Sequence, residues 1–125
     1  MRIILNCRRD TSIKYMLETL KWIKVEDMLQ INALIFVHKI KLGLAPEYLM
    51  SKLTKFTEVH NYNTRNNTNF MLDHKKTKAA QNSVFFRAVQ EYNKLTTNAK
   101  DSTLERFKKL LVEKYRCGTM DQGQL

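Results

Sequence analysis

Residue types that bind metal ions are sparse in this sequence of 125 residues, which contains three histidines and two cysteines. His60, Asp73 and His74 are its only clustered candidate ligands. The two histidines are far apart and no cysteine joins them, unlike the closely spaced ligand pairs of structural zinc sites. We therefore expect no metal ion and no other cofactor, and two solvent-facing histidines in a basic segment instead.

Nucleophilic and acid–base catalysis also lack a supporting pattern. Cys7 precedes Arg8 and Arg9, which would lower a thiol pKa, but a place on an apolar helix face explains this cysteine more simply. His38 lies in a largely apolar stretch, where a hydrogen-bonded structural histidine is expected. The sequence has no Gly-x-Ser-x-Gly motif, no Gly-rich phosphate loop and no Asp-Asp pair. We assign no catalytic residue and do not expect this chain to be an enzyme by itself.

Positive charge is the strongest remaining signal. The formal net charge is +10 and the sequence pI is about 9.8. This balance favours a polyanionic partner, either nucleic acid or an anionic membrane surface, and it equally fits a basic protein without such a partner.

The segment from position 52 to 78 concentrates these cations, with six basic residues against Glu58 and Asp73. Phe56, Tyr62 and Phe70 are interleaved with them, which suits the stacking of bases beside phosphate contacts. The same aromatic residues would also suit anchors that pin an extended strand to a helical core. A second basic cluster lies along the last helix but is diluted by acidic residues. The candidate nucleic-acid-binding residues are Lys52, Lys55, Arg65, Lys75, Lys76 and Lys78.

Helical periodicity predicts the elements that carry these residues. Apolar residues at helical spacing indicate a mainly α fold, a small bundle of about five helices with one long extended basic segment between the fourth and fifth. We expect a single domain made of an N-terminal helical half (1–53), the extended basic segment (54–82), a C-terminal helical pair (83–116) and a frayed tail (117–125). The first helix has only about two turns and looks like the end of a longer helix.

Local signals mark several helix ends. Thr11 or Ser12 is expected to cap the second helix and Asn82 or Ser83 the penultimate one. The third helix, at about 25–42, is apolar on most sides and is expected to be central, with Gly43 in a left-handed conformation just after it. Ser102-x-x-Glu105 has the pattern of a capping box at the start of the last helix.

The compartment is inferred from cysteine usage. Cys7 and Cys117 lie at opposite ends of the chain without metal-ligand spacing, so we expect reduced thiols in an intracellular protein of the nucleus or cytoplasm. The beginning of the chain does not have the pattern of a secretion signal. The longest apolar run, Ala33–Val37, is too short to span a bilayer, which needs about 20 residues.

Taken together, several blocks resemble a known family. The stretch "RIILNCRRDTSIKYMLETLKWIKVEDMLQINALIFVHKIKLGLAPEYL", then "VHNYNTRN", "FML", "NSVFFRAVQEYNKL" and "STLERFKKLL" are similar to the region that follows the catalytic palm in reverse transcriptases of jockey-like non-LTR retrotransposons. The resemblance covers about residues 2–115. It implies a helical, thumb-side part of an RNA-directed DNA polymerase, a region that helps to hold the template–primer duplex.

The resemblance also has limits. The metal-binding aspartate pair of the palm is not found in this sequence, so polymerase activity is assigned to no residue. Where the family commonly has Trp-Asn-x-Leu-Pro, this chain has "YNKLT" at Tyr92–Thr96, which softens the predicted helix stop. Because "HNYNTRN" recurs in the family, we expect this segment to lie over the helices, with Tyr62 or Phe70 anchored and Arg65 paired or facing phosphate.

The sequence thus predicts a non-catalytic C-terminal fragment of a retrotransposon reverse transcriptase. It would bind nucleic acid, RNA or an RNA–DNA hybrid, weakly and without sequence preference, with the upstream polymerase core as a further possible partner. No membrane partner and no small-molecule substrate are expected. Two alternatives remain open: a protein-docking helical module that uses Ile3 and Ile4, and a translated relic of a decayed element without a selected function.

Overall fold

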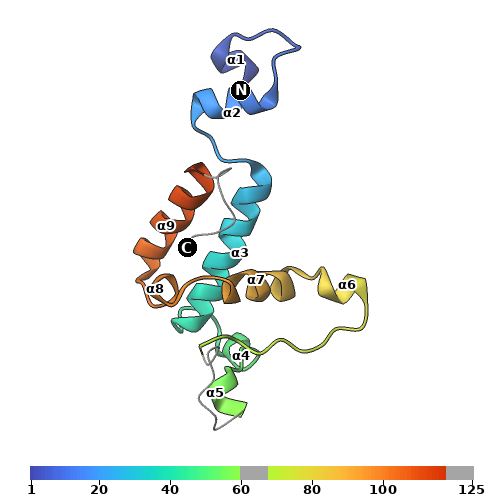
Figure 1. Cartoon of the computed structure of the whole chain (residues 1–125), viewed down its shortest axis with the longest axis vertical. Coiled ribbons are helices and arrows are strands. Elements are labelled where there is room, and N and C mark those ends of the chain that lie inside the picture. The colour runs from blue at the N-terminus through green and yellow to red at the C-terminus, as the bar shows by residue number, and fades with distance from the viewer. Residues whose placement is uncertain (60–67, 118–125) are drawn as a thin grey trace.

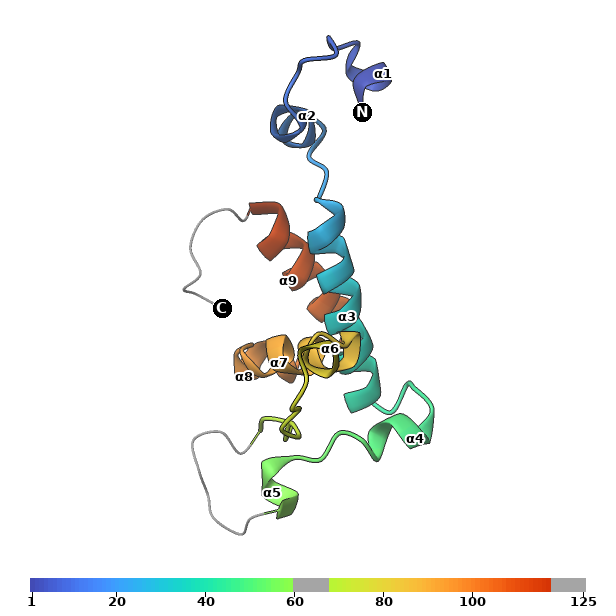
Figure 2. The same cartoon turned by 90° about the vertical axis from the view of Figure 1, so that its right-hand side faces the viewer.

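The computed structural model describes residues 1–59 and 68–117 (Figures 1 and 2). Within these ranges the chain forms nine helices and no named strand, which confirms the mainly α fold and the small helical bundle. The helices are α1 (Arg2–Leu5), α2 (Ile13–Leu20), α3 (Val25–Lys41), α4 (Glu47–Met50), α5 (Phe56–Val59), α6 (Lys78–Gln81), α7 (Val84–Asn93), α8 (Thr97–Lys100) and α9 (Leu104–Cys117).

The core lies where α3 meets α7 and α9. Helix α7 crosses α3, and α9 runs beside it (Figures 1 and 2). Residues at helical spacing on each helix point into this contact and are at most 5 % exposed. They are Ile31, Leu34 and Val37 of α3, Ala88, Val89 and Tyr92 of α7, and Phe107 and Leu111 of α9. Helix α3 is therefore central, as its sequence predicts.

Several local predictions are confirmed at the helix ends. The Ser12 hydroxyl accepts a hydrogen bond from the Tyr15 N–H at the start of α2, and the Ser83 hydroxyl accepts one from the Phe86 N–H at the start of α7. Gly43 has a φ of 72°, the left-handed conformation expected just beyond α3.

Other local predictions are wrong. Helix α9 begins at Leu104, and the Ser102 hydroxyl donates to the Ala99 carbonyl instead of capping the helix. The sequence pattern did not indicate the short helix α8, whose Ala99 carbonyl accepts the bond from the Ser102 hydroxyl. The first helix ends at Leu5, because Asn6 takes a left-handed conformation with a φ of 45°, which short polar side chains tolerate.

The basic segment, residues 54–82, is not extended throughout as predicted. Helices α5 and α6 each add one turn to it, and the Thr77 hydroxyl caps α6 by accepting from the Ala80 N–H. Lys55, just before α5, pairs with Phe70 at an antiparallel bridge. Positions 60–67 lie outside the described residues, as do 118–125 of the predicted tail.

Helices α1 and α2 form a separate tip above the bundle (Figures 1 and 2). Met16 of α2 is 2 % exposed, although it does not belong to the core cluster formed around α3. In the described part of the chain, none of the helices has the length and apolar composition needed to cross a membrane.

Candidate nucleic-acid interface

The basic segment is anchored to the bundle at Phe70. The Phe70 N–H donates to Asn93 Oδ1 at 2.9 Å, and Asn93 Nδ2 donates back to the Phe70 carbonyl at 2.8 Å. The Phe70 ring is 3 % exposed and its centroid lies 5.8 Å from that of Tyr92. The prediction that Tyr62 or Phe70 anchors the segment is therefore confirmed for Phe70.

Backbone pairing closes the segment on either side of this anchor. The Met71 N–H donates to the Thr54 carbonyl at 2.7 Å, and the Phe56 N–H donates to the Asn69 carbonyl at 3.3 Å. These bonds place positions 54–56 beside positions 69–71.

Lys100 provides a second attachment. Its side chain is 4 % exposed, and its Nζ donates to Asn69 Oδ1 at 2.7 Å and to the Asn93 carbonyl at 3.0 Å. Burial, together with the nearby charge of Lys41, lowers the pKa of Lys100. The ammonium also satisfies a carbonyl at the C-terminal end of α7, where a cation interacts favourably with the helix dipole.

This bond explains how α7 ends without the proline of the resembled family. Lys94 continues the helical conformation as the cap, Leu95 is buried, and Thr96 takes an extended conformation that starts α8. Helix α7 therefore ends where Leu95 packs into the core and the Lys100 ammonium donates to the Asn93 carbonyl.

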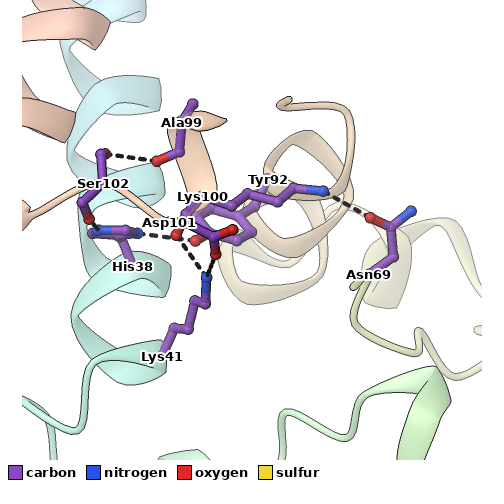
Figure 3. A network of polar contacts seen from close by, with 8 residues as sticks. All are labelled: His38, Lys41, Asn69, Tyr92, Ala99, Lys100, Asp101 and Ser102. Atoms are coloured by element: carbon purple, nitrogen blue, oxygen red, sulfur yellow. Dashed lines mark hydrogen bonds and ion pairs between the residues drawn. The ribbon is translucent and has the colours of Figure 1, made fainter. Parts of the chain in front are cut away.

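A buried histidine completes the network (Figure 3). His38 is fully buried and stacks on Phe107, with ring centroids 4.1 Å apart. Its Nε2 lies 3.0 Å from the Ser102 carbonyl and its Nδ1 lies 2.9 Å from the Tyr92 hydroxyl. Since a carbonyl only accepts, the proton is on Nε2, and Nδ1 accepts from Tyr92. Burial lowers the pKa of His38, in keeping with this neutral form, and the expectation of a structural histidine is confirmed.

Asp101 is bonded to Lys41 and is influenced by the charges of two further lysines. Lys41 Nζ bonds to the Asp101 carboxylate at 2.9 Å and to the Lys100 carbonyl at 2.6 Å. The pKa of Asp101 is lowered, mainly by its hydrogen bond to Lys41 and by the charge of that lysine, with smaller contributions from Lys100 and Lys55. The charge of Lys55, a candidate phosphate ligand, thus acts weakly on the Asp101 carboxylate, which is bonded to Lys41.

The candidate residues from the sequence fall into two groups. Lys52 lies between α4 and α5, and Lys55 is the residue that pairs with Phe70. Lys75 and Lys76 precede α6, and Lys78 is its first residue. Lys52, Lys76 and Lys78 are exposed; Lys55 and Lys75 are half-buried. Lys75 Nζ lies 3.8 Å from Asp73 Oδ2.

Arg65 and Tyr62 lie outside the described residues, and so does His60. The remaining candidate metal ligands, Asp73 and His74, are both exposed. Across residues 1–59 and 68–117 no group of three or more His, Cys, Asp or Glu side chains could hold a metal ion.

Sequence reasoning missed the residues that hold the segment in place. Asn93 bonds to Phe70 and Lys100 bonds to Asn69, across 23 and 31 positions of sequence. Lys41 bonds to Asp101, next to Lys100, across 60 positions. None of the three had a sequence signal for this role, because each bonds to a part of the chain that is distant in sequence.

Comparison with known proteins adds no relative: no protein-family model, no curated protein and no solved structure matches the chain.

Proposed function

We propose that this chain is a non-catalytic, post-palm part of a non-LTR retrotransposon reverse transcriptase. In this proposal it binds the template–primer nucleic acid weakly and without sequence preference. The contacts are made by Lys52, Lys55, Lys75, Lys76 and Lys78, together with Arg65.

The observation that supports it best is the combination of a fixed backbone with exposed cations. Phe70 and its bonds to Asn93 hold the segment on the bundle, while Lys52, Lys76 and Lys78 remain exposed. Ordering the chain before binding lowers the entropic cost of association. Lysine ammonium groups serve as point charges for phosphate, and such contacts carry no sequence information.

The two groups of lysines imply a contact that extends along the duplex. Phosphates repeat along each strand of a duplex, so cations spread over the surface can be engaged together. Lys55 and Lys75 each have a carboxylate nearby, and for that reason we expect about four effective phosphate contacts.

A salt titration of binding to a generic RNA–DNA hybrid tests this function. About four contacts predict a log–log slope of affinity against salt of roughly −3 to −4. Replacing Lys75, Lys76 and Lys78 together with Glu should weaken binding equally for unrelated sequences. The matched control is the Arg106→Glu, Lys108→Glu, Lys109→Glu variant on exposed positions of α9, which changes the total charge by the same amount. A flat slope, or equal losses in both variants, would contradict the proposed site.

A further inference from the structure

The tip of the molecule, residues 1–29, leaves an unusual number of large apolar side chains in solvent. Ile3 is 96 % exposed, Val25 74 % and Leu29 64 %. These side chains come from α1, α2, the link between α2 and α3 that contains Trp22, and the first turns of α3. The apolar residues that are about half exposed or more are Ile3, Ile4, Ile13, Tyr15, Trp22, Val25, Met28 and Leu29.

The bundle does not cover this surface. Helices α1 and α2 stand away from α7 and α9 in both views (Figures 1 and 2). The buried part of α3 begins at Ile31. Its first turns meet α9 through the bond from the Tyr115 hydroxyl to Gln30, but within the described residues Val25, Met28 and Leu29 stay exposed. An exposed apolar surface of this kind marks a site of association.

The charges around this surface select the kind of partner. Residues 1–24 carry six basic side chains, all exposed, against Asp10 and Glu18, and Glu26 and Asp27 follow at the base of the tip. Among the described residues, the ion pair within the tip is Lys14–Glu18, at 4.0 Å and largely exposed. Over residues 1–29 the net charge is +2, six basic against four acidic side chains, so two copies that met through their tips would bring like net charges together. The basic residues are Arg2, Arg8, Arg9, Lys14, Lys21 and Lys24.

The aromatic residues indicate a lipid surface more than an acidic protein. Trp22 and Tyr15 are 51 % and 57 % exposed. In the sequence, Lys14 precedes Tyr15, and Lys21 and Ile23 flank Trp22. Trp and Tyr concentrate at the boundary between lipid headgroups and acyl chains, and lysine and arginine beside them are attracted to anionic headgroups. We propose that the tip docks on the surface of an anionic lipid bilayer, with its apolar side chains entering the headgroup region.

This inference goes beyond the proposed function and uses the opposite end of the molecule. It does not require a membrane-spanning helix, because the apolar side chains enter only the interface. The tip and the nucleic-acid-binding lysines could then be occupied together.

Trp22 makes the test direct, because it is the only tryptophan of the chain. The full chain is titrated with vesicles of phosphatidylcholine alone and with vesicles that also contain about one third phosphatidylserine, at low salt. We expect a blue shift of the Trp22 emission with the anionic vesicles. Partitioning into them, measured by flotation, should exceed partitioning into the neutral vesicles by at least about tenfold.

Two single-substitution variants distinguish lipid binding by the tip from non-specific binding by other exposed apolar side chains. Ile3→Asp, at a side chain that packs on nothing, should reduce partitioning by about tenfold without affecting the bundle. Val84→Asp at the start of α7 is the control, since Val84 is 74 % exposed and lies away from the tip. The emission shift should persist in the Lys75→Glu, Lys76→Glu, Lys78→Glu variant, which keeps the tip unchanged.

Three results would overturn the inference. The first is an unchanged Trp22 emission with anionic vesicles. The second is equal partitioning of the Ile3→Asp and Val84→Asp variants. The third is a Trp22 shift that occurs without lipid, either with rising protein concentration, which would show self-association, or with polyglutamate, which would show an acidic polypeptide as the partner.

Discussion

The side-chain amide of Asn93 takes the place of a neighbouring strand for Phe70. One amide group donates to the Phe70 carbonyl and accepts from the Phe70 N–H, at 2.8 and 2.9 Å, across 23 positions of sequence. Both backbone polar groups of a buried residue are thereby satisfied by one side chain, which fixes the basic segment on the hydrophobic core.

Replacing Asn93 with Ala should release this segment. The substitution removes both hydrogen bonds and leaves two partly buried backbone groups without partners, at a cost of about 2–4 kcal/mol in the free energy of unfolding. Urea denaturation measures this loss, and hydrogen exchange at the Met71 amide should accelerate. Asn32→Ala on the exposed face of α3 is the matched control; an equal loss in both variants would refute the role of Asn93.

The side chain of Phe70 should contribute more to the stability of the protein than that of Met71, the next residue. Phe70→Ala leaves a cavity beside Tyr92 and is expected to cost about 3–4 kcal/mol, whereas Met71→Ala should cost less than about 1 kcal/mol. Met71 is 39 % exposed, so little packing is lost there. Thermal denaturation of the two variants distinguishes an anchored segment from one that only lies on the surface, for which the two losses would be similar.

His38 should make the protein less stable in mild acid. Burial holds the pKa of His38 below its ordinary value of 6.5, so the unfolded chain binds more protons than the folded one as the pH falls below 6.5. The stability gained from the neutral ring is complete above 6.5 and declines towards the lower pKa of the folded state. The free energy of unfolding, measured from about pH 7.5 to pH 5, should show this decline.

Substitutions assign the pH dependence to this ring. His38→Gln should be less stable at neutral pH but lose less on acidification, while His74→Gln, at an exposed position, should keep the original slope. The charge of Asp101 also acts on the His38 ring, but the pKa of Asp101 is lowered further below this range, so its charge stays constant there. An unchanged slope in the His38→Gln variant would exclude this histidine as the cause.

Gly43 and Lys21 provide a reciprocal test of backbone strain. Gly43 has a φ of 72° and a Cβ built there would meet no atom within 4 Å, so Gly43→Ala should cost about 1 kcal/mol through backbone conformation alone. Lys21 has a φ of 54° at the end of α2, and Lys21→Gly should therefore not destabilise the chain. Urea denaturation measures the free energy of unfolding of both variants. If Gly43→Ala and Lys21→Gly changed it by the same amount, the backbone at both helix ends would relax and the left-handed conformation would not be the cause.

Removing the carboxylate of Asp73 should strengthen nucleic-acid binding. Asp73 lies 3.8 Å from Lys75 and both side chains are solvent-accessible, so Asp73→Asn frees one cation and raises the net charge by one. We expect affinity for an RNA–DNA hybrid to rise several-fold at low salt, with the salt slope steeper by up to about 1. Glu47→Gln on α4 is a control for net charge; an equal gain there would point to a non-local effect.

Much of the fold followed from short stretches of sequence. The periodicity of α3, the serine caps of α2 and α7 and the left-handed Gly43 depend on residues within one or two turns of each other, so their chemistry can be read locally. The same local logic failed at Ser102, because α8 places the Ala99 carbonyl within reach of its hydroxyl.

The sequence by itself determined a basic, mainly helical chain and the identity of its candidate phosphate ligands, since these depend on composition and helical spacing. Only the tertiary structure decided that Phe70 is the anchor, that Lys100 is buried and that the apolar tip is left uncovered. The burial of Phe70 and of Lys100 depends on contacts between segments far apart in the chain. The exposure of the tip depends on where the rest of the described chain packs. Local spacing carries no information on which side of a helix will find a partner.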